Sequence, residues 1–270
     1  MFVIDSSGRP PGSRLKELWG YRELILFLTW REVMIRHKQT FVGIAWVVLQ
    51  PLLAMLVLAL VLSKLFRVGD TGAPYPLFCL AGLVPWNFFA AGLSQASNSL
   101  VMNPDLITKI YFPRVAMPLS VLLAGMVDFA INLAFLALAL IWYRVMPTVH
   151  ILWIPLFILL TFTAVLGVSL WLAALNVEYR DVRYVIPFMT QLWMFATPVF
   201  YPASLIRGPY QLLYALNPMD GAVEGFRWAL WGGTAFPSGI VAVSCLSAFV
   251  LLTTGLLHFG RAEVTFADIV

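Results

Sequence analysis

The pattern of hydrophobic and polar residues divides the chain into long apolar segments separated by shorter polar ones. A helix of about 20 apolar residues is long enough to cross the roughly 30 Å hydrocarbon layer of a bilayer. On this basis the pattern predicts six membrane spans, at residues 42–63, 75–101, 115–142, 151–175, 185–201 and 239–259. We therefore expect an all-α integral membrane protein.

The polar stretch between the second and third spans has the pattern of a separate helix. Asn103 can cap a helix, Pro104 suits its first position, and Asp105 complements the positive end of its dipole. Pro113 disfavours helix at the residue before it, so the helix within 103–112 should be about two turns long. The residues alone leave a simple capped loop equally open.

The segment before the first span predicts a polar lead at residues 1–20 and a helix at residues 21–40. Apolar Leu26 and Trp30 share one side of this helix, and Arg36 lies opposite them. We expect the helix to lie in the membrane interface with its basic side chains at lipid phosphates, although a helix packed on a soluble partner is an alternative. The lead has no apolar signal-peptide region, so the first span should serve as the insertion signal.

Composition supports the membrane assignment and adds an orientation. The chain is 61% hydrophobic and only 11% charged, whereas soluble proteins carry about 25% charged residues. With six spans, twelve of the 17 Lys and Arg residues fall on the side of the amino terminus. Because cytoplasmic loops carry the basic excess, both termini and the 103–112 helix should be cytoplasmic. The net charge of +4 gives no reason to expect nucleic-acid binding.

The chain should therefore form one transmembrane domain over residues 1–270. Its predicted parts are a lead with the interfacial helix at 1–41, a six-span bundle at 42–260 and a cytoplasmic tail at 261–270.

Common catalytic and nucleotide-binding motifs are missing from the sequence. There is no G-x-x-x-x-G-K-[ST] string, so the chain forms no P-loop of its own, and neither H-E-x-x-H nor G-x-S-x-G occurs. The two cysteines and three histidines are scattered without metal-ligand spacing. We expect no catalytic residue, metal or cofactor in this chain, and we expect any power source to lie on another polypeptide.

Asp128 and Asn132 place a polar pair on one face of the predicted third span. Ionisable groups at this depth are costly and usually face protein or water. We favour hydrogen bonding between helices over a proton or substrate site, because no second acid is visible to complete a relay.

The turn after the fourth span, residues 176–184, carries both signs of charge. It either docks a partner or is a solvated, self-paired turn. Its candidate contact residues are Tyr179, Arg180, Asp181 and Arg183.

The region between the fifth and sixth spans, residues 202–238, is too apolar for an exposed loop and too charged for a simple span. We expect a re-entrant or interfacial helical hairpin on the outer face, because such backbone needs surrounding protein or a water-filled cavity. The candidate outer-gate residues are Asn217, Asp220, Glu224, Arg227 and Trp228.

Aromatic residues away from the charged loops are candidates to line a path for sugar rings, since aromatic faces stack on flat apolar surfaces. Lipid-facing packing is the alternative for each of them. The candidates are Trp86, Phe88, Phe89, Trp193 and Phe195.

Several strings occur in order along nearly the whole chain and together form a family resemblance. They are Arg31-Glu32, GIAW at 43–46, QP at 50–51, LITKIYFPR at 106–114, PLS at 118–120, NVEYRD at 176–181, ATPVFY at 196–201 and the segment from NP at 217–218 to Arg227. This set resembles the ABC-transporter permeases that export polysaccharides, a family that includes O-antigen, capsule and teichoic-acid exporters. The family's usual Lys-Lys is Thr108-Lys109 here.

The resemblance implies a homodimer of six-span subunits in the bacterial inner membrane, paired with two copies of a separate ATPase that binds ATP and Mg. The 103–112 helix would be a coupling helix in a groove of that ATPase, and the 178–184 turn would lie nearby. Short gate helices would form at 205–234. The implied coupling residues are Asp105, Leu106, Lys109, Tyr111 and Arg114.

The substrate implied by the resemblance is a lipid-linked, O-antigen-like polysaccharide moved through a membrane-lipid environment. An ABC permease for a small drug or lipid is the main alternative. A proton-coupled transporter that uses Asp128 and a membrane-bound transferase are further alternatives. The identity of the glycan is not readable from the sequence.

Overall fold

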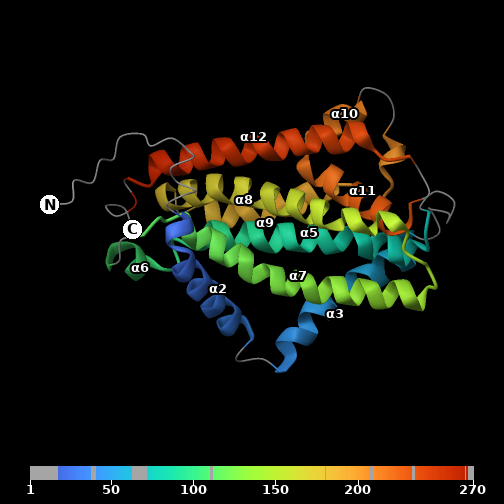
Figure 1. The fold of residues 1–270 in the computed structure, drawn as a ribbon, viewed down its shortest axis with the longest axis horizontal. Coiled ribbons are helices and arrows are strands. Elements are labelled where there is room, and N and C mark those ends of the chain that lie inside the picture. Colours follow the sequence, from blue (N-terminus) through green and yellow to red (C-terminus); the bar gives the residue numbers. More distant parts are fainter. Residues whose placement is uncertain are drawn as a thin grey trace.

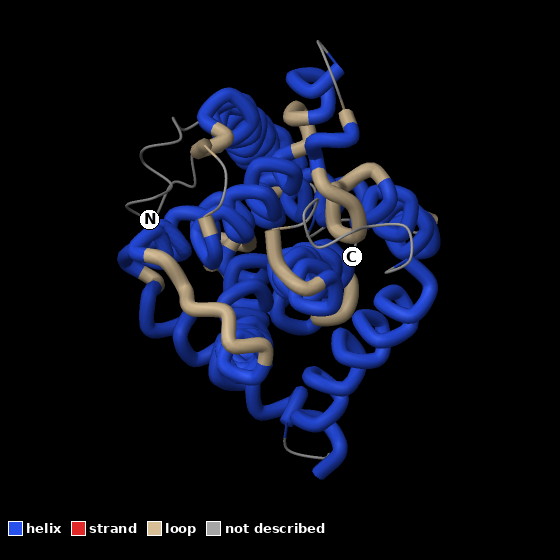
Figure 2. The backbone as a smooth tube through the Cα atoms, turned by 90° about the vertical axis from the view of Figure 1, so that its right-hand side faces the viewer, coloured by secondary structure: helices blue, strands red, loops and turns tan. Residues whose placement is uncertain are grey.

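The computed structural model describes residues 18–37, 41–62, 72–109, 112–179, 181–206, 210–232, 235–264 and 266. All regular structure in these residues is helical, and Figure 2 looks along many of the helices nearly end-on. The elements are α2 (Arg22–His37), α3 (Phe41–Leu62), α5 (Tyr75–Asn98), α6 (Pro104–Lys109), α7 (Ala116–Trp142), η1 (Val149–Trp153), α8 (Ile154–Glu178), α9 (Val182–Phe195), η2 (Ala203–Leu205), α10 (Tyr210–Tyr214), α11 (Pro218–Trp231) and α12 (Ser238–Ala262).

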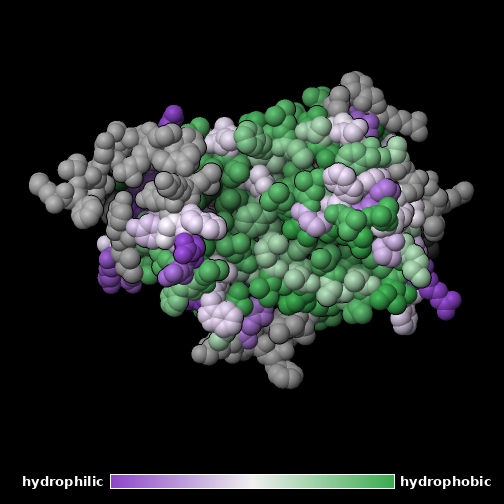
Figure 3. Space-filling view, viewed as in Figure 1, coloured by the Kyte–Doolittle hydropathy of each residue, from purple (hydrophilic) through white to green (hydrophobic). Residues whose placement is uncertain are grey.

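Four helices are long and apolar enough to cross a membrane. They are Tyr75–Asn98, Ala116–Trp142, Val149–Glu178 and Ser238–Ala262. They match predicted spans two, three, four and six, and they run side by side along the long axis of the molecule (Figure 1). Figure 3 shows a hydrophobic middle with hydrophilic residues gathered toward the two ends. These features confirm the all-helical membrane architecture.

The first and fifth predicted spans are less complete in the structure. In α3, the apolar stretch of described side chains covers only Val47–Val57. Helix α9 has 14 residues, about 21 Å at 1.5 Å per residue, which is shorter than the hydrocarbon layer. It starts three residues before the predicted 185–201 segment and ends six residues before its end. The count of six spans therefore stays a prediction.

Close backbone contact holds α8 and α12 together. A Cβ atom at Gly255 would come within 2.5 Å of the Gly167 carbonyl oxygen, and one at Gly167 within 2.7 Å of the Leu252 nitrogen. Small residues allow this approach, which is typical of helix packing in membranes. Helix α5 is the most buried of the four candidate spans and contacts α3, α7, α8, α9 and α11.

Helix α2 leaves the bundle at an angle and forms a V with α3 (Figure 1). Ile25 and Leu28 on α2 are buried, whereas Leu26 and Trp30 are exposed. The exposed apolar side supports the predicted interfacial placement. One part of that prediction is wrong: Arg36 turns toward α7 and pairs with Asp128, at 3.1 Å, so it does not extend outward to lipid phosphates.

A second hydrophobic cluster, separate from the main core around α5, lies where α6 joins the bundle. We call it the end cluster. It brings together the ends of α2, α7, α8 and α12 with α6 and the segment after α12. Its members are Ile25, Leu28, Leu100, Ile107, Phe112, Val115, Ala116, Met117, Leu170, Ala173, Ala174, Val177, Phe259 and Phe266.

Candidate functional site

Helix α6 occupies Pro104–Lys109, within the predicted 103–112 segment. Ile107 is buried in the end cluster, while the side chains of Asp105 and Lys109 are exposed and form an ion pair at 2.7 Å. Leu106 packs against the same cluster. The helix therefore has one side anchored in the bundle and one polar side open. Tyr111 lies outside the described residues.

Asn103 connects α6 to its surroundings. Its Oδ1 accepts a hydrogen bond from Arg31 Nη2 at 3.2 Å, and its Nδ2 donates to the Ser99 carbonyl at 2.9 Å. Its backbone oxygen accepts from Leu106 N at 3.2 Å. The side chain predicted to cap the helix is therefore engaged with α2 and with the end of the preceding span.

Arg114, after α6, is held by residues that follow α12. Its backbone N–H donates to Glu263 Oε1 at 2.8 Å, and its guanidinium donates to the Glu263 carbonyl. The guanidinium also lies over the ring of Phe266, which packs edge-on against Phe259. We call these contacts the 114–266 clasp. Because Arg114 is engaged within the chain, its role toward a partner stays a prediction.

The turn after α8 lies at the same end of the bundle, since Val177 belongs to the end cluster. Asn176 is buried and donates to Ser97 O and Asn98 Oδ1, which fixes α8 to α5. The predicted contact residues Tyr179, Asp181 and Arg183 are exposed, and Arg183 donates to the Tyr184 hydroxyl at 2.7 Å. Arg180 lies outside the described residues. The exposed side chains leave both docking and self-pairing open.

The predicted outer-gate residues lie on α11 or immediately before it, far from α6 along the bundle (Figure 1). Asn217 caps this helix, since its Oδ1 accepts from Met219 N at 3.1 Å. Pro218 occupies the first helical position. Asp220 stands in the first turn, where its carboxylate complements the helix dipole.

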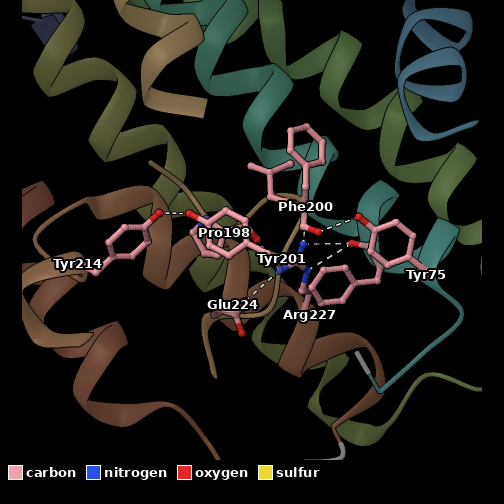
Figure 4. Close-up of polar contacts among 9 residues, drawn as sticks. Tyr75, Pro198, Phe200, Tyr201, Tyr214, Glu224 and Arg227 are labelled. Atoms are coloured by element: carbon pink, nitrogen blue, oxygen red, sulfur yellow. Dashed lines mark hydrogen bonds and ion pairs between the residues drawn. The ribbon is translucent and has the colours of Figure 1, made fainter. Parts of the chain in front are cut away.

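Arg227 is the most heavily bonded side chain of this region (Figure 4). Its Nη1 donates to Pro198 O at 2.6 Å and to Glu224 Oε1 at 2.9 Å. Its Nη2 donates to Val199 O at 2.6 Å and to Phe78 O at 3.2 Å. The guanidinium carbon also lies 3.5 Å from the centre of the Phe78 ring. We call this constellation the Arg227 site.

The Arg227 site connects α11 to α5 and to the turn that ends α9. Arg227 provides hydrogen-bond donors for the Pro198 and Val199 carbonyls of this turn. Gly82 makes room for the guanidinium, because a Cβ atom there would lie 2.6 Å from Arg227 Nη2. Tyr75 adds a second link from α5, donating to Phe200 O at 2.8 Å. Sequence reasoning missed Tyr75 and Gly82; a glycine inside an apolar span was the available signal of close approach.

Asn217 holds the same turn from the other end of α11. Trp193 Nε1 donates to Asn217 Oδ1 at 2.8 Å. The Asn217 amide donates to Ala196 O at 3.1 Å and to Thr197 Oγ1 at 2.9 Å. The strings ATPVFY at 196–201 and NP to Arg227 therefore form one structural unit.

Asp220 and Trp228 have different surroundings. Asp220 is buried, and its Oδ1 has no hydrogen-bond partner among the described residues. Helix α11 is not one of the four candidate spans. Burial of the Asp220 carboxyl, together with the nearby Glu224 carboxylate, raises its pKa to about 7. Trp228 stacks on His150 at 4.2 Å between ring centres and packs against Phe236. Trp228 thus attaches α11 to η1, which sequence reasoning did not foresee.

Asp128 forms contacts with α2. Its Oδ2 lies 3.1 Å from Arg36 Nη1, and its Oδ1 lies 3.3 Å from His37 Nε2. Asn132 donates to the Asp128 carbonyl at 3.0 Å. The basic partners were not foreseen, because they lie more than 90 residues away in the sequence.

Most of the aromatic candidates for a path are packed inside the chain. Trp86, Phe88 and Phe89 are buried, and Phe89 packs edge-on against Trp193 at 5.0 Å. Phe195 is exposed. Their role in a path stays a prediction.

Comparisons with known proteins identify the family and several relatives. The family description "ABC-2 type transporter" matches residues 23–231. The chain is 30% identical over 253 residues to the O-antigen export system permease protein RfbA of Myxococcus xanthus, covering 92% of this chain and 96% of that protein. It is 25% identical over 258 residues to RfbA of Klebsiella pneumoniae, covering 95% and 98%. It is 23% identical over 233 residues to the polysialic acid transport protein KpsM of Escherichia coli, covering 84% and 87%.

The matched residues extend from α2 to the end of α11 and so include α6, the turn after α8 and the Arg227 site. The chain therefore belongs to the ABC-2 type transporter family, among the permeases of polysaccharide export.

Proposed function

We propose that this chain is the membrane-spanning subunit of an exporter that moves a lipid-linked, O-antigen-like polysaccharide across the bacterial inner membrane. In this proposal two copies of the chain form the path, both termini are cytoplasmic, and two copies of a separate ATPase subunit bind ATP and Mg. Support comes from the family and from relatives whose names state O-antigen export or polysialic acid transport.

The placement of α6 is the observation that carries the proposal. Asp105 and Lys109 are open to a partner, whereas Ile107 is buried among residues of α2, α7, α8 and α12. Interiors packed this closely transmit displacement and do not absorb it. A partner that moves α6 would therefore act on four helices together.

The mechanism that follows starts on the partner subunit. ATP binding draws the two ATPase subunits together and displaces α6 and the end cluster. The helices of the two permease copies then shift, and a path opens between the copies. At the other end, the Arg227 site makes α5, α11 and the end of α9 move as a unit. The polysaccharide advances through weak contacts, because tight binding at each sugar would stop it.

The double variant Asp105→Ala/Lys109→Ala tests the coupling role of α6. Removing the exposed polar side should abolish stimulation of the ATPase by the permease and stop export, while the folded permease persists because Ile107 is retained. Co-purified permease and ATPase give the first readout, and surface glycan gives the second. Arg144→Asn is the matched control. It removes an exposed cation that follows α7 at the far end of the bundle, and asparagine tolerates the positive φ of this position.

The two parts of the proposal fail separately. If the double variant retains full ATPase stimulation and export, the coupling assignment is wrong. If deleting the permease does not cause glycan to accumulate inside the cell, the polysaccharide assignment is wrong, and a small drug or lipid becomes the substrate to test. Proton coupling through Asp128 is disfavoured, because that carboxylate already pairs with Arg36.

A further inference from the structure

A cavity of about 310 Å³ lies between α2, α3, α5 and α7. Its polar lining residues are Arg36, Gln50, Asn87, Gln95, Asp128 and Asn132. Figure 1 shows that α2 and α3 diverge from α7 and meet at an apex away from the bundle. The cavity lies between this V and the faces of α5 and α7.

The depth of the cavity makes its polar lining unusual. Asn87 lies near the middle of α5 (Tyr75–Asn98), and Asp128 lies near the middle of α7 (Ala116–Trp142). Both helices are candidate membrane spans. Polar side chains at this depth are costly unless they face protein groups, water or a substrate. Asn87 and Asp128 are half-buried and Asn132 is buried, whereas Gln50 and Gln95 are exposed. The three covered polar side chains indicate a polar occupant.

Unused amide groups describe the chemistry of that occupant. No hydrogen bond among the described residues engages the side chains of Gln50, Asn87 or Gln95. Asn132 is 7% exposed, and its Oδ1 has no hydrogen-bond partner among the described residues. Leaving a buried acceptor without a partner is unfavourable. Amides offer both donors and acceptors, which matches hydroxyl groups.

Charge argues against an anionic occupant. Arg36 Nη1 bonds to Asp128 Oδ2 at 3.1 Å, and Arg36 Nη2 bonds to Val121 O at 3.2 Å. The cation is therefore neutralised inside the site and its donors are directed at protein groups. A phosphate would find a carboxylate beside the arginine, whereas a neutral hydroxylated molecule meets no such repulsion.

Two aromatic side chains belong to the otherwise aliphatic remainder of the wall. Phe88 and Phe129 line the cavity, with ring centres 5.4 Å apart. Aromatic side chains supply apolar faces against which the C–H side of a sugar ring can pack. The volume is at the lower limit for ligand pockets, which begin at about 300 Å³.

We propose that this cavity binds one or two sugar units of the exported glycan as a neutral, polyhydroxylated ligand. Gln50, Asn87, Gln95 and Asn132 bond to its hydroxyl groups, and Phe88 and Phe129 contact its ring. The inference rests on the proposed function. It adds an intrachain site in which each subunit holds a short piece of the glycan beside its own α3.

Protection of an introduced cysteine tests the site in the full chain reconstituted in lipid nanodiscs. Ala91→Cys places a thiol on the cavity wall, and a small water-soluble thiol reagent measures its accessibility. Free hexoses and a disaccharide are the probes, with inorganic phosphate as the anionic comparison. Thr108→Cys on exposed α6 is the matched control, and the unaltered chain gives the background from Cys79 and Cys245.

We expect the sugars to slow labelling at Ala91→Cys by the factor 1 + [L]/Kd, about twofold when the sugar concentration equals Kd. Phosphate should have no effect, and labelling at Thr108→Cys should not change. Adding Asn132→Leu should reduce sugar protection while the thiol stays reactive, and Asn87→Leu should do the same if the first variant folds poorly.

Three results would overturn the proposal. If the Ala91→Cys thiol never reacts, the cavity is closed. If its labelling rate is the same with and without sugar, the cavity holds only water. If phosphate protects it, the cavity is an anion site. These outcomes are independent of the proposed function, since glycan accumulation after deletion of the permease is measured separately. If sugars give no protection at Ala91→Cys while export is intact, the site is ruled out and the proposed function still stands.

Discussion

Replacing Arg227 by methionine should be among the most destabilising single changes in this chain. Methionine keeps most of the side-chain length and removes every donor. The change leaves the carbonyls of Phe78, Pro198 and Val199 without the partner that Arg227 provides. Each unpartnered buried carbonyl costs about 1–3 kcal/mol, and breaking a buried charged pair costs about 3–5 kcal/mol. Both figures include the groups that are left unpaired, so they are not added, and we expect a loss of about 3–5 kcal/mol.

The exposed pair on α6 supplies the comparison. The side chains of Lys109 and Asp105 are 72% and 82% exposed, whereas those of Arg227 and Glu224 are 3% and 21% exposed. Exposed pairs at this spacing contribute only about 0.3–0.5 kcal/mol. Lys109→Met should therefore be nearly silent in stability, even though both changes convert a cation to methionine.

Unfolding by a denaturing detergent in mixed micelles, followed by tryptophan fluorescence, measures both free energies on one scale. Arg227→Lys should fall between the two, because it keeps the charge but loses the planar fork that reaches several acceptors. Equal midpoints for Arg227→Met and Lys109→Met would refute the reasoning. Such a result would mean that the turn after α9 finds other partners for its carbonyls.

Three further predictions concern other parts of the structure. Asp220→Asn should stabilise the protein above about pH 7 and lose that advantage as the pH falls toward 4. The raised pKa means that, as the pH falls, the folded carboxyl takes up its proton at a higher pH than the unfolded carboxyl does, so protonation restores the stability of the native protein. Detergent unfolding across this pH range checks the sign. Gly255→Val should destabilise the protein strongly, since a Cβ atom meets the Gly167 carbonyl at 2.5 Å, while Leu257→Val on an exposed face should have little effect in the same assay. Phe266→Ala should weaken the 114–266 clasp. ATPase stimulation and export should fall by more than the loss of folded protein, followed by the thermal midpoint, accounts for. Activity losses that match the loss of folded protein would count against a coupling role.

The sequence predicted correctly those helices that are defined by their own residues, such as capping residues, prolines and continuous apolar runs. The caps and prolines around 103–113 predicted a helix of about two turns, and α6 occupies Pro104–Lys109. Continuous apolar runs predicted the four long helices, because length and hydropathy are properties of each segment. The long pattern at 185–201 failed to show that α9 ends at Phe195.

Contacts between distant segments explain what the pattern could not show. The turn after α9 is stabilised by Asn217 and Arg227, which lie about 20 and 30 residues further along the chain. Likewise Asp128 was recognised as costly, but no spacing rule connects it to Arg36, 92 residues earlier. The candidate gate residues were selected correctly as unusual, whereas their partners Tyr75 and Gly82 depend on how α5 and α11 meet.

The 114–266 clasp also orders the steps by which the protein is made. Glu263 and Phe266 follow α12, so they leave the ribosome after every candidate span has been synthesised. The junction after α6 receives these contacts only at that point. During translation, the junction after α6 therefore lacks these contacts until α12 has been made. In the proposed complex, an ATPase that requires the supported form would bind only a permease with its last helix in place. The clasp would then act as a check on assembly, and it would prevent a partly synthesised permease from capturing the motor.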